Sequence, residues 1–274
     1  MSPWVLRGLR EGVVTTRWPA RPDPYADDWR GPATVLGPGP ADLAALCPTG
    51  AISGQDGGDS LALDQGRCVL CGRCVAERPD VFGWTRGTAN ARLTRAALVV
   101  PEVTETEQEL ARVRSALASR TRALRRSVHL RHVDAGSDGA EEHEIAALLN
   151  PVYDIHRLGI FFTASPRHAD VLLVTGAGAH GMASPVRRTY EGMPDPKVVI
   201  AVGTDAVSGG LLGGQGDEPS GGSATSGGVG ALVPVDVWLP GSPPPPFAVL
   251  QALLAALGRL PAGAQARAAG KDGS

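Results

Sequence analysis

Short apolar runs bounded by glycine recur through the second half of this chain. Residues 169–176 and 197–203 are almost continuous in Val, Leu, Ile and Ala, which is typical of parallel strands buried on both faces. Residues 128–133 and 231–239 have a similar apolar character. All four runs are predicted to be β-strands.

Stretches of helical length separate or follow these runs. Residues 141–149, which end at Asn150-Pro151, and the apolar residues 247–257 are predicted helices. Strands that alternate with helices predict an α/β domain with a doubly wound, flavodoxin-like parallel sheet. Ligands bind to such sheets at the carboxyl ends of the strands. The corresponding loops are residues 134–141, 176–185, 203–210 and 240–246.

A helical pattern of a different kind precedes the α/β region. Over residues 104–126, Leu110, Val113, Leu117 and Leu124 recur on one face, and six arginines lie among the other positions. We expect a solvated linker helix. The alternative is a basic face that meets anionic lipid or an acidic partner subunit.

These patterns divide the chain into unequal parts. Residues 1–98 are rich in Gly and Pro and have little periodicity, as expected of a small domain organised by a cofactor. The Gly- and Ser-rich residues 209–230 are expected to form a flexible surface insertion. The predicted order is a small domain, a linker helix, an α/β domain and a disordered tail, at residues 1–98, 99–126, 127–261 and 262–274.

The overall composition narrows the functional class. Apolar residues make up 43% of the chain and permit real cores, while a net charge near −2 gives no reason to expect nucleic acid binding. The sequence has neither a signal-peptide pattern nor an apolar run near the ~18 residues that a membrane span needs. We therefore expect a soluble cytoplasmic protein with reduced thiols.

All four cysteines fall within one short window, as Cys47-Pro48 and Cys68-x-x-Cys71-x-x-Cys74. Three thiolates at this spacing suit a loop around one face of a [4Fe–4S] cube, and a remote Cys-Pro supplies the fourth ligand. A zinc site and two disulfides are the alternatives. Zinc usually takes paired Cys-x-x-Cys knuckles, and disulfides suit small secreted domains. The spacing favours one [4Fe–4S] cluster.

The first part of the chain resembles the eight-iron, ferredoxin-like subunit of respiratory complex I and of membrane-bound nickel–iron hydrogenases. The resemblance rests on LRGLREG at 6–12, WRG at 29–31, CPTGAI at 47–52 and CVLCGRC at 68–74. In that family each half carries four cysteines. Here the cysteines of one cluster are replaced by Gly37, Pro40, Leu43 and Arg78. The resemblance therefore implies a ferredoxin-like domain with one cluster.

The second part resembles the 20 kDa-type small subunit that lies near quinone in complex I, or near nickel in energy-converting hydrogenases. The matching segments are residues 131–137, 149–155, 164–176, 188–197, 199–203 and 233–241. The chain is thus identified as a natural fusion of the two subunit types.

The second part also departs from its family, whose members bind a [4Fe–4S] cluster through four cysteines in the strand-end loops. The resemblance aligns those positions with Asp138, Glu141, Asp205 and Ser242. Oxygen ligands are hard, so these residues suit Mg²⁺, Ca²⁺ or Mn²⁺ rather than a cluster. The simpler hypothesis is that they are solvated loop residues at a retired site.

Together these features predict an electron-transfer subunit that is not catalytic on its own. The resemblance implies a large-subunit-like partner, membrane-arm subunits, quinone at the subunit interface, and a peripheral position on the inner face of the cell membrane. The alternative is a structural or regulatory scaffold subunit, with or without a carboxylate metal site.

Overall fold

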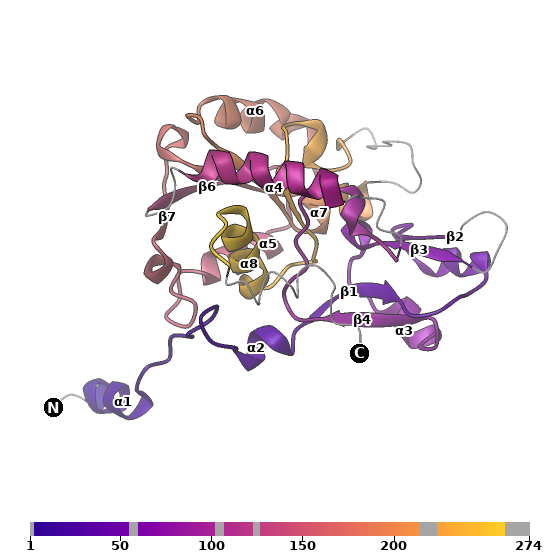
Figure 1. Ribbon diagram of the computed structural model, residues 1–274, viewed down its shortest axis with the longest axis horizontal. Helices are drawn as coiled ribbons and strands as arrows, with labels where there is room; N and C mark the ends of the chain where they lie inside the picture. Colours follow the sequence, from indigo (N-terminus) through magenta and orange to yellow (C-terminus); the bar gives the residue numbers. More distant parts are fainter. Residues whose placement is uncertain (1–2, 55–59, 102–106, 123–126, 214–223, 261–274) are drawn as a thin grey trace.

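The computed structural model describes residues 3–54, 60–101, 107–122, 127–213 and 224–260. The predicted tail at residues 262–274 lies outside the described residues, as does Leu124 of the predicted linker helix. Figure 1 shows an α/β body with a smaller group of antiparallel strands beside it.

A five-stranded sheet forms the centre of the α/β body, and all its strands are parallel. The strand order is β10-β9-β8-β6-β7, so the chain reverses direction across the sheet between β6 and β8, as in flavodoxin-like folds. This confirms the predicted doubly wound α/β domain. The strands are β6 (Val128–Asp134), β7 (Ile160–Phe162), β8 (Val171–Thr175), β9 (Val198–Val202) and β10 (Val237–Leu239).

Both faces of this sheet are covered. Alternate residues of β8 enter different cores: Leu173 packs with α4, α5 and α8, whereas Leu172 packs with α6 and α7. This two-sided burial explains why the central strands are apolar at every position. The helices are α4 (Glu107–Thr121), α5 (Ala140–Ala147), α6 (Ala183–Glu191), α7 (Thr204–Ser208) and α8 (Pro246–Ala256).

Two small antiparallel sheets precede the α/β body. One pairs β1 (Arg30–Val35) with β4 (Phe82–Arg86), and the other has the order β2-β3-β5. Their shared core contains Phe82 and Leu63. The remaining elements here are α1 (Pro3–Glu11), α2 (Pro24–Asp27), β2 (Ile52–Gly54), β3 (Leu61–Asp64), α3 (Arg73–Glu77) and β5 (Val99–Val100).

Short 3-10 helices connect many of these elements. They are η1 (Ala41–Leu46), η2 (Gln65–Arg67), η3 (Ala96–Leu98), η5 (Ile155–Leu158), η6 (Pro166–His168), η7 (His180–Met182), η8 (Gly210–Leu212) and η9 (Val229–Ala231).

Specific contacts join the small sheets to the α/β body. Arg92 and Trp238 exchange backbone hydrogen bonds of 2.9 and 2.8 Å, which covers the exposed edge of β10. The buried hydroxyl of Thr88 donates to Gln251 Oε1 of α8 at 3.0 Å. The two parts are therefore packed together and not merely linked.

The structure corrects two predictions made from the sequence. The strand predicted over residues 231–239 is confined to β10, because Pro234 cannot donate to a ladder and pairing with β9 begins only at Val237. The predicted linker helix is α4, and its Leu117 is buried in the core on one face of the sheet. Around Leu117 the helix is therefore packed on the α/β body and is not fully solvated.

Among the helices of the described residues, none is long and apolar enough to cross a membrane.

Candidate functional site

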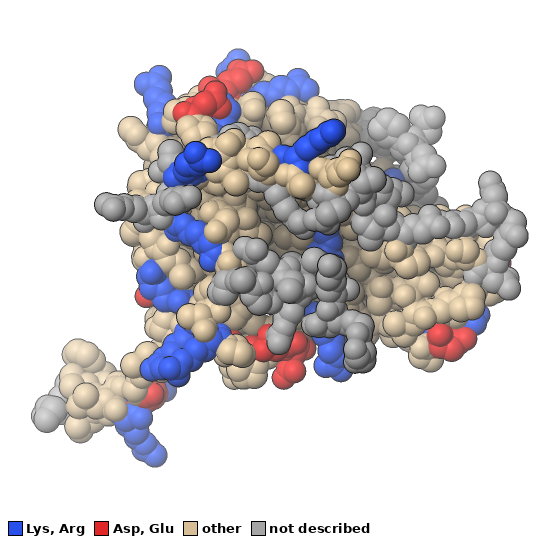
Figure 2. All heavy atoms as spheres, viewed as in Figure 1, with Lys and Arg blue, Asp and Glu red and all other residues tan. Residues whose placement is uncertain are grey.

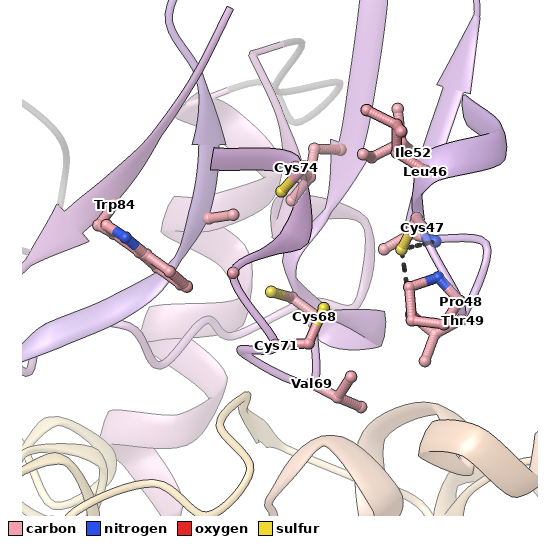
Figure 3. A pocket seen from close by; sticks show the side chains of 14 residues that line it. Leu46, Cys47, Pro48, Thr49, Ile52, Cys68, Val69, Cys71, Cys74 and Trp84 are labelled. Carbon is pink, nitrogen blue, oxygen red and sulfur yellow. Dashed lines mark hydrogen bonds between the residues drawn. The ribbon is translucent and has the colours of Figure 1, made fainter. Parts of the chain in front are cut away.

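The four cysteines of the chain line one pocket between the two small sheets. Cys47 follows η1, Cys68 follows η2, and Cys74 lies in the first turn of α3. Cys71 lies in the loop between the last two and is exposed. Figure 3 shows Cys68, Cys71 and Cys74 grouped on one side and Cys47 approaching from the other. The structure thus brings all four predicted ligands to the same place.

Backbone conformation lets three of these cysteines share one short loop. Leu70 and Gly72 both adopt the left-handed region, with φ of 53° and 75°. A Cβ atom on Gly72 would also lie 3.1 Å from the Trp84 ring, so glycine suits both the turn and the close approach. The chain therefore curls tightly enough to place cysteines three residues apart around a common centre.

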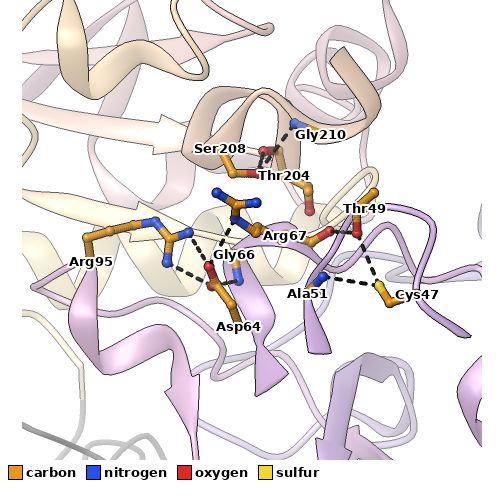
Figure 4. A network of polar contacts seen from close by, with 10 residues as sticks. All are labelled: Cys47, Thr49, Ala51, Asp64, Gly66, Arg67, Arg95, Thr204, Ser208 and Gly210. Carbon is orange, nitrogen blue, oxygen red and sulfur yellow. Dashed lines mark hydrogen bonds and ion pairs between the residues drawn. The ribbon is translucent and has the colours of Figure 1, made fainter. Parts of the chain in front are cut away.

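A polar network fixes the strand and turn that lead into Cys68. Asp64 accepts hydrogen bonds from Arg95 at 2.8 and 2.5 Å and from the Gly66 amide at 2.9 Å. Arg67 lies 3.6 Å from the same carboxylate. Figure 4 shows this network beside the Cys47 loop. The Asp64 side chain is only 18% exposed. Because its carboxylate is largely shielded from water, these charge-assisted hydrogen bonds stabilise the turn.

Cys47 has hydrogen-bonding neighbours of the type that surround cluster sulfurs. The Ala51 amide donates to Cys47 Sγ at 3.2 Å, and Thr49 Oγ1 lies 3.3 Å from the same sulfur. Thr49 is itself held by donation to the Arg67 carbonyl at 2.7 Å. Hydrogen bonds to cysteine sulfur are one of the means by which a protein sets the potential of an iron–sulfur cluster.

Burial favours the neutral form of two thiols in the pocket. Burial raises the pKa of Cys68, and burial together with the neighbouring Cys68 raises the pKa of Cys74 to about 11. None of the four cysteines is in a disulfide. Bound metal favours the thiolate forms and releases their protons. In the absence of a positive partner, Cys68 and Cys74 therefore stay protonated.

Four thiols are the donor set of a [4Fe–4S] cluster and also of a structural zinc site. In the described residues, no three His, Cys, Asp or Glu side chains are gathered closely enough to hold a single metal ion. The chemistry of the four donors that line the pocket therefore fits a metal centre, and the choice of a cube rests on the spacing of the cysteines along the sequence.

The cysteine loop rests directly on the carboxyl edge of the large sheet. Thr204 Oγ1, at the start of α7, donates to the Cys68 carbonyl at 2.9 Å and accepts from the Gly241 amide at 3.2 Å. A Cβ atom on Gly66 would lie 2.7 Å from Val207 Cγ1, which shows how closely η2 and α7 approach. No sequence pattern singles out Thr204, because Cys68 and Gly241 are remote from it along the chain.

Two positions assigned by resemblance to a second ferredoxin cluster have other partners. Leu43 packs against the small core, where it lies near Leu61 and Val81. Arg78 forms two hydrogen bonds with Asp80, at 2.9 and 2.7 Å.

The four strand-end positions Asp138, Glu141, Asp205 and Ser242 have unlike surroundings. Asp138 and Ser242 are exposed, and Asp138 caps the Ala140 amide at 2.9 Å. Asp205 is half-buried, and burial together with Asp138 raises its pKa. No three of the described acidic, histidine or cysteine side chains form a group that could hold a metal ion, and these four positions are no exception.

Glu141 differs from the other three, because only 2% of it is exposed. Its Oε2 atom is buried without a hydrogen-bond partner. Burial and the nearby Asp205 and Asp138 raise the pKa of this carboxyl to about 7. The side chain lies against Gly203, where an added Cβ would be 2.4 Å from Glu141 Oε1. With a pKa of about 7, the Glu141 carboxyl is about half protonated near neutral pH.

A neighbouring polar cluster was missed by the sequence analysis. Glu142 accepts a short hydrogen bond from Thr175 and another of 2.8 Å from Ser137, and its carboxylate lies 3.4 Å from His132 Nε2. Burial lowers the pKa of His132. These residues join the ends of β6 and β8 at the point where the strand order reverses. Nothing in their spacing along the chain indicates that they meet.

Fold and site together define a doubly wound α/β protein with a thiol-lined site docked on its ligand-binding edge. The family model for the 20 kDa subunit of NADH ubiquinone oxidoreductase matches residues 139–256. The probable membrane-bound hydrogenase subunit mbhJ of Pyrococcus furiosus is 37% identical over 158 residues, which cover 56% of this chain and 87% of that protein. The chain belongs to the NADH ubiquinone oxidoreductase 20 kDa subunit family.

A further relative and one solved structure are also similar to this chain. Formate hydrogenlyase subunit 7 of Escherichia coli (strain K12) is 40% identical over 159 residues, which cover 58% of this chain and 60% of that protein. A chain of the membrane-bound sulfane sulfur reductase, an archaeal respiratory membrane complex, aligns with a TM-score of 0.41 and 26% identity. That alignment covers 55% of this chain and 76% of that one. The chain thus spans 60% of the length of formate hydrogenlyase subunit 7, and both named sequence relatives are hydrogenase-related subunits by their names.

Proposed function

We propose that the protein is the electron-transfer subunit of a membrane-associated, complex I-like or hydrogenase-like oxidoreductase and carries a single [4Fe–4S] cluster. Its ligands would be Cys47, Cys68, Cys71 and Cys74. The observation that carries the proposal is the convergence of all four thiols on one pocket. When bound, the cluster supplies reversible one-electron chemistry.

The surrounding residues would tune and orient this group. The Ala51 amide would stabilise the Cys47 thiolate through its 3.2 Å hydrogen bond. The Asp64–Arg95 pair would hold the turn before Cys68 in place. Cys71 is exposed, which gives the pocket one side open to an electron donor or acceptor.

The α/β body would serve mainly as the docking unit in this account. All the cysteines of the chain lie within residues 47–74, so the body contains no thiol of its own. Its positions Asp138, Glu141, Asp205 and Ser242 would mark a cluster site that has lost its ligands. A fusion of a ferredoxin-like unit with a small-subunit-like unit would bring the remaining cluster to the edge of the sheet, where Thr204 contacts Cys68.

The partners follow from this arrangement. The relatives mbhJ and formate hydrogenlyase subunit 7 carry the names of multi-subunit enzymes. By analogy, a large hydrogenase-like subunit would cover the strand-end loops, membrane-arm subunits would lie below, and quinone would bind at a subunit interface. The chain would reach the cell membrane peripherally, from the cytoplasmic side.

The test is a redox titration of anaerobically purified protein. Reduced protein should give a paramagnetic signal close to one spin per chain, and Cys74→Ala should abolish it. Ser53→Ala, a change on the exposed end of β2, should leave it intact. A cluster that is present but is neither reduced by a low-potential donor nor reoxidised by the partner complex would favour the scaffold alternative instead.

A further inference from the structure

Helix α1 joins the rest of the described structure only through its C-terminal end. None of its nine residues is buried, and it stands away from the body in Figure 1. Trp4 and Leu9 are 74% and 72% exposed. Val13 and Val14, which follow the helix, are also exposed. Single apolar residues are normal on a surface, but several exposed ones on one short segment make it a candidate binding surface.

The helix separates apolar from charged side chains. At 100° per residue, Trp4, Val5, Leu9 and Leu6 spread over an arc of about 200° of the helix circumference. The charged residues occupy the remaining, narrower arc, where Arg7 pairs with Glu11 at 2.7 Å. Trp and Leu opposite arginine is the composition of helices that lie in a membrane interface.

The charge around the helix is positive, although the whole chain has a net charge near −2. Residues 3–21 contain four arginines and one acidic residue. Figure 2 shows Lys and Arg side chains along the arm and where it joins the body. A basic segment with an apolar face is complementary to an anionic lipid surface, because it combines apolar burial with attraction to phosphate groups.

The arm is fixed where it reaches the α/β body. The Thr16 amide donates to the Val152 carbonyl at 2.9 Å, and Thr15 Oγ1 donates to the Pro151 carbonyl at 2.7 Å. Trp18 is buried and packs edge-on against Phe247 of α8, with 5.6 Å between the two ring centroids. Because residues 15–18 are anchored on the α/β body and α1 is exposed, α1 can contact another surface without a change in the fold.

We propose that α1 binds the surface of an anionic lipid bilayer, with Trp4, Leu6 and Leu9 in the headgroup–acyl boundary and Arg7 and Arg10 near lipid phosphates. The inference rests on the proposed function for its setting, because it names the segment through which this subunit meets the membrane. Its test uses the protein alone, so its failure is distinguishable from failure of the cluster proposal.

The experiment is co-sedimentation of the full-length protein with lipid vesicles. Vesicles of equal phosphatidylglycerol and phosphatidylcholine should bind the protein, while phosphatidylcholine alone or high salt should weaken binding. The double variant Trp4→Ser, Leu9→Ser should bind at least about tenfold more weakly, because it loses two side chains that would be buried in lipid. Its iron content should match that of the unaltered protein.

The matched control is Leu211→Ser, Leu212→Ser, which removes two exposed leucines far along the chain from α1. This control should bind vesicles like the unaltered protein. The proposal fails if the unaltered protein ignores anionic vesicles, or if both double variants bind equally. If vesicles are ignored but the α1 variant dissociates from its partner subunits, the helix binds protein and not lipid.

Discussion

The buried Glu141 gives the protein a pH-dependent stability that a single substitution should remove. Its pKa rises from an ordinary 4.5 to about 7, first because it is buried and then because Asp205 and Asp138 lie near. The folded protein therefore holds this proton more tightly than the unfolded chain does. The resulting stabilisation is complete below pH 4.5 and is lost as the pH rises through 7.

The size of the effect follows from the two pKa values. A tenfold change in proton affinity corresponds to about 1.4 kcal/mol, so ionising Glu141 in the folded state costs about 3 kcal/mol relative to the unfolded chain. Glu141→Gln keeps the shape of the protonated acid and cannot ionise. At pH 8 the variant should be more stable than the unaltered protein by up to about 3 kcal/mol, and at pH 5 the difference should shrink to about 1 kcal/mol or less.

The assay is anaerobic urea denaturation at pH 5, 6, 7 and 8, with the difference between variant and unaltered protein taken at each pH. Taking differences cancels the titration of all other groups. Glu191→Gln, at the exposed end of α6, is the matched control and should show no such trend. A difference that stays constant from pH 5 to pH 8 would refute the reasoning.

Two further substitutions test how the strand-end loops are built. Gly203→Ala should destabilise the protein by about 3 kcal/mol, because φ is +93° there and the new Cβ would lie 2.4 Å from Glu141 Oε1; thermal denaturation measures this, and an unchanged midpoint would show that the loop can move aside. Thr204→Val keeps the side-chain shape but removes the 2.9 Å hydrogen bond to the Cys68 carbonyl. It should cost about 1–2 kcal/mol in urea denaturation while the protein still binds its full complement of iron, and a loss of iron would instead give Thr204 a part in holding the cluster.

The central strands could be predicted from the sequence because their environment is uniform. β8 and β9 are buried on both faces, so every position is apolar and the pattern is unambiguous. The same apolar pattern led to a wrong prediction at residues 231–239, where only Val237–Leu239 form a strand. Val233 is apolar because it is buried in a non-strand segment before β10, and hydrophobicity alone does not distinguish a packed loop from a strand.

The candidate site could likewise be predicted only in part from the sequence. Cys68, Cys71 and Cys74 are close in sequence, so their local spacing was enough to predict that they belong to one binding site. The contacts of Thr204 with Cys68 and of Glu141 with Gly203 join residues more than sixty positions apart, and they arise only when the chain folds. No periodicity or motif carries that information.

The most direct test of the whole account is the iron and acid-labile sulfide content of anaerobically purified protein. With one cube held by Cys47, Cys68, Cys71 and Cys74, we expect about four irons and four sulfides per chain, and correspondingly none in a variant that lacks all four thiols. Eight irons per chain, a single zinc ion, or four titratable thiols without iron would contradict it.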